Sequence, residues 1–342
     1  MKKLENTLYI TSPDAYISKE GENVVIHKNK EEIGRVPIHL IDNLISFTYS
    51  GVSTQAMKLC SDNNVPISFM SPSGGFISSL SGTTKGNVLL RRAQFRAADD
   101  KDFCIKISRN MIIGKISNCR KVIGRCIRDH PDTNDDESLS DALCGLSTNL
   151  SSLLTSNELD VIRGIEGDAA KTYFRAVDNM ILKNKEDFFM RGRNRRPPTD
   201  KMNALLSFSY SLLTSDLKSA IMAVGMDPFV GFLHTDRPGR PSLALDMMEE
   251  LRSPIADRFA LNLVNLGQIG PDDFEETEGE GTHLNERGRK LFIKEWQERK
   301  HNEINHPFLG EKIERGLLPY VQSQLLAKYI RGDIEGYPPY MV

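Results

Sequence analysis

The residue pattern of this chain changes character near residues 81–86 (Ser-Gly-Thr-Thr-Lys-Gly). Before this point, short runs rich in β-branched and aromatic residues are separated by turn-forming Gly, Pro, Asn and Asp, which is typical of strands. After it, apolar residues recur at helical spacing over long stretches. We therefore predict an α+β chain in which a small β-rich amino-terminal domain precedes a larger all-α carboxy-terminal domain.

The β-rich domain is predicted to span residues 1–82, followed by a linker at residues 83–88. One helix is expected inside it, over residues 53–62, because Ala56, Leu59 and Cys60 lie at helical spacing. The strands are predicted over residues 6–11, 23–27, 34–40, 65–70 and 75–80.

The helical domain is predicted to span residues 89–342. Its first helix is expected to begin at Leu89 and to continue past Phe103 to Ile113. Polar residues predict a loop at 131–137, and the six acids between Asp272 and Glu280 predict a flexible surface loop. Further helices are predicted over residues 155–174, 204–217 and 243–266.

Composition limits the class of protein. The chain has 342 residues, enough for two domains, and a net charge of −2, so binding to nucleic acid would have to come from local basic patches. Nothing resembles a signal peptide and no apolar run reaches about 18 residues, which predicts a cytoplasmic protein that does not cross a membrane. The five cysteines form no C-x-x-C pair, and Walker and G-x-G-x-x-G motifs are absent, which argues against a zinc ribbon, ATP or a dinucleotide.

Three segments that are far apart in the sequence carry residues that could bind a metal ion. The first is Glu166, which has Gly164 and Gly167 close by. Because glycine costs a helix about 1 kcal/mol relative to alanine, the pair indicates a close approach by backbone or ligand. The second is His234, at the end of an apolar run, and the third is the acidic group that contains Glu249. Two carboxylates and one imidazole suit Mg²⁺ or Mn²⁺ better than structural zinc. Taken alone, each residue is also explained as an ordinary surface or hydrogen-bonded side chain.

The acidic segment lies on a predicted helix for which Ser242 is a suitable N-cap. Asp246, Glu249 and Glu250 form a narrow acidic stripe opposite a broad apolar face. Residues three and four apart are neighbours on a helix, so Asp246 is expected beside both glutamates, a like-charge cluster that a cation would offset. The alternative is a solvent-exposed acidic face.

Basic residues lie close in the sequence to the second of these segments and in a separate run. Arg237 and Arg240 come directly after His234, where they are expected to contact DNA near the metal. A second basic run, residues 183–201, can follow a phosphate backbone, although a solvated loop explains it equally well. The predicted DNA contacts in this run are Arg193, Arg195 and Arg196, with Tyr210 and Lys290 as weaker candidates elsewhere.

The order and spacing of these motifs resemble one known family, the Cas1 endonuclease and integrase of CRISPR adaptive immunity, and within it the subtype I-C form. The likeness covers essentially the whole chain and is carried by residues 203–213, 231–235, 243–252 and 337–340. The resemblance implies that Glu166, His234 and Glu249 bind one Mg²⁺ or Mn²⁺ ion and carry catalysis. Asp246 matches a second acid near the metal, and Glu250 and Asp246 are alternatives to Glu249 as the third ligand.

The same resemblance implies a metal-dependent DNA endonuclease and integrase that serves antiviral defence. It would insert new spacers into a CRISPR array by transesterification, in which a 3′-hydroxyl attacks a phosphodiester. It would form a homodimer through the β-rich domains, and the small Cas2 protein would join two dimers in a heterohexamer. This complex would hold double-stranded DNA, both the spacer precursor and the leader–repeat. From the residues alone, two other classes are open: a metal-dependent phosphohydrolase acting on a nucleotide, and a DNA-binding scaffold whose acidic stripe is structural.

Overall fold

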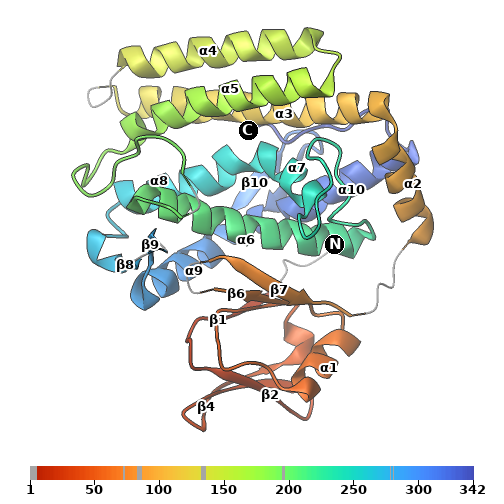
Figure 1. Ribbon diagram of the computed structural model, residues 1–342, viewed down its shortest axis with the longest axis vertical. Helices are drawn as coiled ribbons and strands as arrows, with labels where there is room; N and C mark the ends of the chain where they lie inside the picture. The colour runs from red at the N-terminus through yellow and green to blue at the C-terminus, as the bar shows by residue number, and fades with distance from the viewer. Residues whose placement is uncertain are drawn as a thin grey trace.

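The computed structural model describes residues 6–71, 74–82, 87–131, 136–194, 197–277, 279 and 281–342. Strands with one helix among them occupy the described chain up to Leu80, and helices predominate from Val88 onward, as predicted. Figure 1 shows the strands at one end of the molecule and the helical layers stacked above them. Residues 83–86 of the predicted linker lie outside the described residues. No helix in the described part of the chain is long and apolar enough to cross a membrane.

The β-rich part contains two sheets. Its elements are β1 (Thr7–Ile10), β2 (Tyr16–Glu20), β3 (Asn23–Lys28), β4 (Glu31–Pro37), β5 (Asn43–Ser46), α1 (Thr54–Asp62), β6 (Ile67–Met70) and β7 (Phe76–Leu80). One sheet has the order β1-β5-β6-β7, with β1, β5 and β6 parallel and β7 antiparallel to β6. The other is the antiparallel meander β2-β3-β4. Both sheets and α1 share a core of buried aliphatic residues, which makes this part a compact unit.

Two of these strands are not predicted by the sequence pattern. β2 is half polar and only one of its residues, Ile17, is fully buried. β5 has four residues, all buried between parallel neighbours, so it is too short for a period to show. The strand predicted at 34–40 ends at Pro37, because a 3-10 turn (Ile38–Leu40) follows it.

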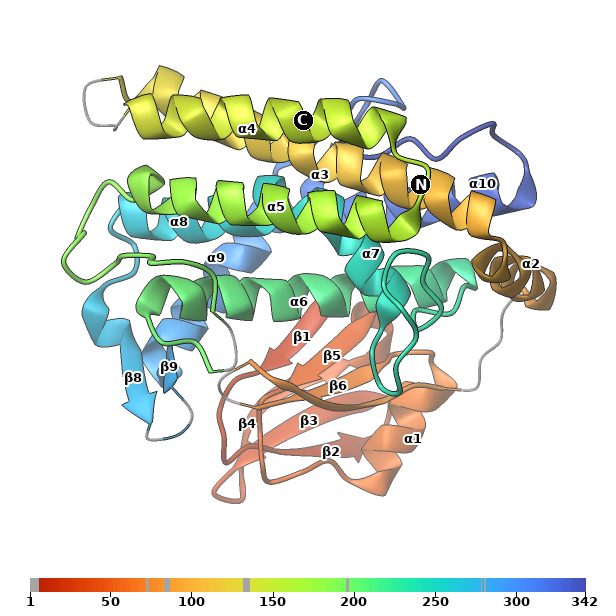
Figure 2. The same cartoon turned by 45° about the horizontal axis from the view of Figure 1, so that its top comes forward.

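The helical part is built around α3. Its helices are α2 (Val88–Asp99), α3 (Lys101–Asp129), α4 (Asp136–Thr155), α5 (Leu159–Val177), α6 (Lys201–Val224), α7 (Ser242–Leu251), α8 (Arg258–Asn265), α9 (Glu286–Lys300) and α10 (Leu318–Arg331). α3 packs against α4, α5 and α7, whereas α6 contacts α7 and α10. In Figure 2, α6 runs between the layer of α3 to α5 and the four-stranded sheet.

The sheet is fastened to α6 by aromatic packing. Phe47, which follows β5, stacks on Phe208 of α6 with ring centroids 5.8 Å apart. Gly74 in the β6–β7 turn has φ +84° and lies so close that a Cβ there would meet the Phe208 ring at 2.4 Å. The two parts of the chain therefore meet through a specific apolar contact.

Two predicted helices are divided in the structure. The single helix expected from 89 to 113 is wrong, because the Asp100 side chain accepts from the N–H groups of Asp102 and Phe103 and so caps a new helix, α3. The helix predicted at 243–266 consists of α7, a π-helical segment (Arg252–Asp257) and α8. The wider π turn accommodates Pro254, which has no N–H to donate.

The carboxy-terminal part is helical but also contains two hairpins that the sequence pattern does not predict. They are β8 (Phe274–Thr277) with β9 (Gly281–Leu284), and β10 (Glu303–His306) with β11 (Glu311–Glu314). The flexible loop predicted at 272–280 is therefore wrong over its described residues, since Asp273 is buried and holds Arg287 Nε at 2.7 Å. Of the loop predicted at 131–137, α4 already includes Asp136 onward and residues 132–135 lie outside the description.

Candidate active site

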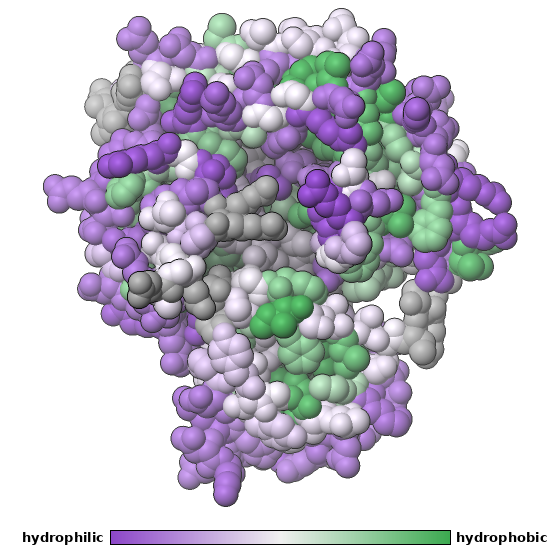
Figure 3. All heavy atoms as spheres, in the orientation of Figure 1, coloured by the Kyte–Doolittle hydropathy of each residue, from purple (hydrophilic) through white to green (hydrophobic). Residues whose placement is uncertain are grey.

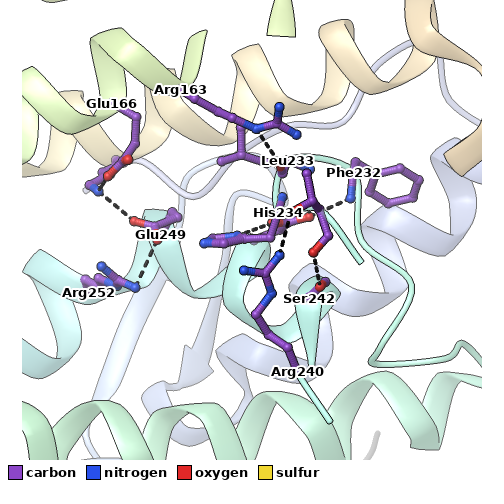
Figure 4. A network of polar contacts seen from close by, with 12 residues as sticks. Arg163, Glu166, Phe232, Leu233, His234, Arg240, Ser242, Glu249 and Arg252 are labelled. Atoms are coloured by element: carbon purple, nitrogen blue, oxygen red, sulfur yellow. Dashed lines mark hydrogen bonds and ion pairs between the residues drawn. The ribbon is translucent and has the colours of Figure 1, made fainter. Parts of the chain in front are cut away.

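Glu166 and Glu249 meet at one charged centre. Glu166 lies on α5 and Glu249 on α7, and both helices pack against α3. Lys115 of α3 joins the two carboxylates, because its Nζ donates to Glu166 Oε1 and lies 2.7 Å from Glu249 Oε2. Figure 4 shows the carboxylates turned toward each other. The Glu249 side chain is 3% exposed and that of Glu166 is 26% exposed, so the centre opens to solvent on the Glu166 side.

Arg252 completes the charge balance around Glu249. Its Nη2 lies 3.0 Å from Glu249 Oε1, the oxygen that faces away from Lys115. Burial disfavours the charge of Glu249, but Arg252 and Lys115 outweigh it and lower the pKa of Glu249 from 4.5 to about 2. Burial also opposes the charge of Lys115, and Glu249 with Glu166 outweigh it, so the pKa of Lys115 is raised. Glu249 is therefore ionised at neutral pH and held between two cations.

His234 is fixed in place by Asp246. Asp246 Oδ1 accepts from His234 Nδ1 at 2.6 Å and from the His234 backbone N–H at 3.0 Å. Its Oδ2 accepts from the N–H groups of Phe232 and Leu233 at 2.6 and 3.0 Å. Gly231 permits this approach, because a Cβ there would meet Asp246 Oδ2 at 2.6 Å. With Nδ1 occupied, Nε2 is the nitrogen left for a ligand, and Figure 4 shows the ring turned toward Glu249.

The predicted acidic stripe on α7 is wrong. Asp246, Glu249 and Glu250 are all buried, because α3 and α6 pack against α7. Asp246 is directed at the His234 loop and Glu249 at Lys115. The three acids therefore do not lie against one another, and each is directed at a different part of the chain.

Glu250 is directed at the last residues of the chain. Its Oε1 accepts from Tyr337 Oη at 2.5 Å and from Gln322 Nε2 at 2.7 Å, and its Oε2 accepts from the Tyr340 N–H at 3.1 Å. Burial raises the pKa of Glu250 to about 8, even though these hydrogen bonds favour the carboxylate. Among the three acids of α7, Glu249 is thus the one that shares a partner, Lys115, with Glu166.

The two glycines close to Glu166, Gly164 and Gly167, face open space. A Cβ at Gly164 or Gly167 would meet no atom within 4 Å, so the close approach by backbone that the two glycines predict is not found, and the approach of a ligand stays a prediction. One turn before Glu166, Arg163 Nε donates to the Leu233 carbonyl at 2.8 Å. Arg163 thereby ties α5 to the loop that carries His234. Ser242 does not cap α7 as predicted, since its hydroxyl donates to the Thr235 carbonyl at 3.4 Å.

The predicted DNA contacts differ in their accessibility. Arg237 is exposed on the loop after His234, and Arg240 Nη2 donates to Thr235 Oγ1 at 3.0 Å in the same loop. Arg193 is half-buried, and its guanidinium donates to Asn203 and lies 5.3 Å from the centre of the Tyr210 ring. Arg193 is therefore anchored inside the chain, and Arg195 and Arg196 lie outside the described residues.

The two weaker candidates have partners within the chain. Tyr210 Oη donates to buried Asp257 at 2.6 Å, with Arg252 on the ring at 5.0 Å. Lys290 pairs with Glu286 at 2.7 Å on the surface of α9. Helix packing therefore accounts for Tyr210, and a surface ion pair accounts for Lys290.

The donor set fits a hard divalent cation, although the present arrangement is held by Lys115. Glu249 Oε2 is buried and, despite its distance of 2.7 Å from Lys115 Nζ, has no well-directed hydrogen bond. Two carboxylates and an imidazole nitrogen are suitable ligands for Mg²⁺ or Mn²⁺. Within the described ranges, no three such side chains are already close enough to hold an ion. A bound metal would therefore take up the role that the Lys115 ammonium has between Glu166 and Glu249.

Sequence reasoning missed three residues of this site: Lys115, Arg252 and Arg163. Lys115 has a detectable signal, since it is the one charge in the otherwise apolar run at residues 111–116, where a buried charge needs a partner. Arg163 has no such signal, because its partner Leu233 is distant in the sequence. Arg252 has none either, because its pairing with Glu249 three residues earlier looks in the sequence like an ordinary ion pair on a helix surface.

Comparison with known proteins identifies the family of this chain. Residues 8–298 match the family described as CRISPR associated protein Cas1. "CRISPR-associated endonuclease Cas1 1" of Chlorobaculum tepidum is 46% identical over 341 residues, covering 100% of this chain and 99% of the relative. "CRISPR-associated endonuclease Cas1 2" of Rhodospirillum rubrum is 44% identical, covering 99% of each.

The fold is also shared with solved structures. A casposase bound to integration product has a TM-score of 0.84 at 23% identity, covering 97% of this chain and 93% of that one. A Cas1 protein from Thermotoga maritima has a TM-score of 0.81 at 22% identity, covering 97% and 99%. Because the family match extends over most of the chain and the relatives align from end to end, this chain belongs to the CRISPR-associated Cas1 endonuclease family.

Proposed function

We propose that this chain is a metal-dependent DNA endonuclease and integrase that inserts new spacers into a CRISPR array by transesterification. The observation that carries the proposal is that Lys115 joins Glu166 and Glu249 at one partly open centre, toward which the His234 ring held by Asp246 is turned (Figure 4). Relatives named as endonucleases, and the fold shared with a casposase bound to its integration product, support the same chemistry.

The residues of the chain suit the reaction at a phosphodiester. Mg²⁺ or Mn²⁺ bound by Glu166, His234 and Glu249 would supply Lewis acidity to a phosphoryl oxygen. Asp246 keeps the His234 ring oriented with Nε2 free, and Arg252 holds one oxygen of Glu249 so that the other faces the centre. The exposed side of Glu166 gives the DNA access. A 3′-hydroxyl as the attacking group gives joining, and water gives cleavage.

Strand transfer tests this function directly. The purified protein, with Cas2 and Mg²⁺ or Mn²⁺, is given a short duplex with 3′-hydroxyl ends and a supercoiled plasmid carrying leader and repeat. We expect covalent joining that stops when EDTA removes the metal. Cleavage without joining, with the partner and metal verified, would leave a nuclease and overturn the integrase part of the proposal.

Lys115 is expected to compete with the metal, because its ammonium binds the same two carboxylates. Unit charges 4 Å apart interact by about 4 kcal/mol at an effective dielectric constant near 20, so removing this charge should raise Mn²⁺ affinity by at least about tenfold. The measurement is an electron paramagnetic resonance titration of free Mn²⁺ with the wild type and Lys115→Met. The control is Lys106→Met, which changes an exposed lysine of the same helix. A weaker affinity in Lys115→Met would instead mean that the lysine assembles the site.

The proposed partners are double-stranded DNA and Cas2. Structural relatives with the same fold are described as a Cas6-RT-Cas1–Cas2 complex and as a casposase bound to integration product. By this likeness we infer that Cas2 joins two dimers of this chain into a heterohexamer on spacer precursor and leader–repeat. From the same resemblance we infer the subtype I-C form, and for a protein that acts on a CRISPR array we propose action in the cytoplasm. Arg237 and Arg240, next to His234, are the proposed DNA contacts nearest the metal.

A homodimer through the β-rich part is supported by an unpaired apolar edge. β7 ends the four-stranded sheet, and its Phe76 and Ile77 are 52% and 58% exposed. Figure 3 shows apolar atoms gathered over this end of the molecule. Because a two-fold axis can place two copies of one edge strand side by side, a second copy of this chain is the proposed occupant.

Removing the apolar edge is expected to separate the dimer. Phe76→Asp with Ile77→Asp should shift the protein from dimer to monomer in sedimentation velocity, because two charged side chains would replace the apolar ones in the contact. The control is Leu266→Asp, a residue of the helical part that is 67% exposed. A double variant that sediments as the wild type would place the dimer contact elsewhere.

A further inference from the structure

Arginines from four separate elements converge at the start of α8. Arg258 begins α8, Arg299 lies in the last turn of α9, Arg315 begins the 3-10 turn that precedes α10, and Arg125 lies on α3. Arg299 and Arg315 line the same small cavity, about 20 Å³ in volume. The Arg315 N–H donates to the Asn302 carbonyl at 2.9 Å, which fastens this turn to the end of α9.

The guanidinium of Arg299 is also tied to α8. It lies 5.6 Å from the centre of the Phe259 ring. The Asn262 amide, in the orientation that satisfies both its neighbours, accepts from Arg299 Nη1 at 3.1 Å and donates to the Arg258 carbonyl at 3.1 Å. Three half-buried arginines are thus held together by the packing of α8, α9 and the turn before α10.

The cluster lacks matching acids among the described residues. No carboxylate forms an ion pair with Arg258, Arg299 or Arg315, and Arg299 Nε is buried without a hydrogen bond. Two acids near the cluster already have other partners: Asp129 pairs with Arg125 at 2.9 Å, and Asp216 pairs with Lys300 at 2.7 Å. An excess of three positive charges is therefore built into one place in a chain whose net charge is −2.

This arrangement costs stability unless an anion offsets it. Burial, together with Arg315, Arg258 and Arg125, lowers the pKa of Arg299 to about 10, and burial with Arg125 and Arg315 lowers that of Arg258. In the described contacts, none of the four arginines is bonded to Glu166, His234 or Glu249, so the cluster is separate from the metal centre. Guanidinium groups match phosphate oxygens in geometry and charge.

We propose that Arg258, Arg299 and Arg315, with Arg125 at the rim, bind a phosphate group of the DNA backbone. The cavity has room for about one water molecule, so the phosphate would lie on the solvent side of the guanidinium groups. The proposal deepens the proposed function, since it names a second place where the chain holds the DNA on which the metal centre acts.

The test is DNA binding as a function of salt, in EDTA, so that it does not depend on metal or on strand transfer. The variant is Arg258→Gln with Arg315→Gln, and the control is Arg35→Gln with Arg331→Gln, two exposed arginines that have acidic partners. Each phosphate contact contributes about 0.9 to the slope of log affinity against log salt. We expect the cluster variant to lower the slope by one to two contacts and to weaken binding about tenfold or more at low salt. We expect the control to lower neither.

Thermal unfolding with inorganic phosphate distinguishes a ligand site from a merely structural cluster. At equal ionic strength, phosphate should raise the Tm of the wild type above that in chloride and should not do so for the cluster variant. Without phosphate, the variant should unfold at the same Tm as the wild type or higher, because mutual repulsion is relieved. A phosphate effect with an unchanged DNA slope would overturn DNA as the source of the phosphate. A variant that loses stability and keeps wild-type DNA binding would overturn the site altogether.

Discussion

Replacing His234 with alanine is expected to lower the rate of strand transfer by at least about 10³-fold, with DNA cleavage lost in parallel. The reason is that the ring offers the one nitrogen donor among the proposed ligands, and Lewis-acid stabilisation is worth several kcal/mol in the transition state. The measurement is the single-turnover rate of joining at saturating Mn²⁺. The control is His301→Ala, which removes an exposed histidine at the end of α9. Joining at the wild-type rate would exclude His234 from the mechanism.

Asp246→Asn separates orientation of the ring from ligation. Both oxygens of Asp246 accept hydrogen bonds, four in all from three backbone N–H groups and His234 Nδ1. An asparagine must turn an NH₂ group toward one pair of these donors, so the His234 loop loses contacts while the imidazole remains. Residues that orient a metal ligand typically contribute 10–100-fold. We therefore expect a loss of about that size, smaller than that of His234→Ala, and a loss equal to it would mean that Asp246 acts as a ligand itself.

Much of the fold follows from local pattern. The change near residue 81 predicts strands before helices, and α1 and α6 are found where helical spacing places them. The wrong predictions concern places where one or a few residues determine the local structure. Asp100 divides one apolar stretch into α2 and α3 by capping, and β5 is defined by its parallel neighbours and has no period of its own. The hairpins of the helical part likewise depend on pairing partners that local propensity does not reveal.

The residues of the candidate site could be predicted from the sequence, but the environment of each side chain could not. Opposite an apolar face, the acids of α7 look exposed, and on an isolated helix they would be. In the folded chain α7 is enclosed on all sides, which sends Asp246 to a loop, Glu249 to Lys115 and Glu250 to the last segment of the chain. The choice between Glu249 and Glu250 as third ligand therefore depends on tertiary contacts, and these favour Glu249.

The burial of Glu250 predicts a pH-dependent stability. Its pKa is about 8 in the folded protein and 4.5 for the ordinary carboxyl, so between these values the folded state retains a proton that the unfolded state releases. The contribution is present in full below pH 4.5 and is lost as the pH rises through 8. The full difference corresponds to about 5 kcal/mol, an order-of-magnitude figure, because one pKa unit is worth about 1.4 kcal/mol.

The expected result is a Tm of the wild type that falls between pH 6 and pH 8.5, measured by calorimetry in EDTA, and a smaller fall for Glu250→Gln. Glutamine is neutral throughout, but it presents an NH₂ group to the Tyr340 N–H or to Gln322, so the variant should be less stable than the wild type at pH 6. The two stability curves should therefore converge as the pH rises. Glu298→Gln, an exposed position on α9, should keep the wild-type slope. Parallel curves for Glu250→Gln and the wild type would mean that Glu250 is already ionised at pH 6 and that its three hydrogen bonds outweigh its burial.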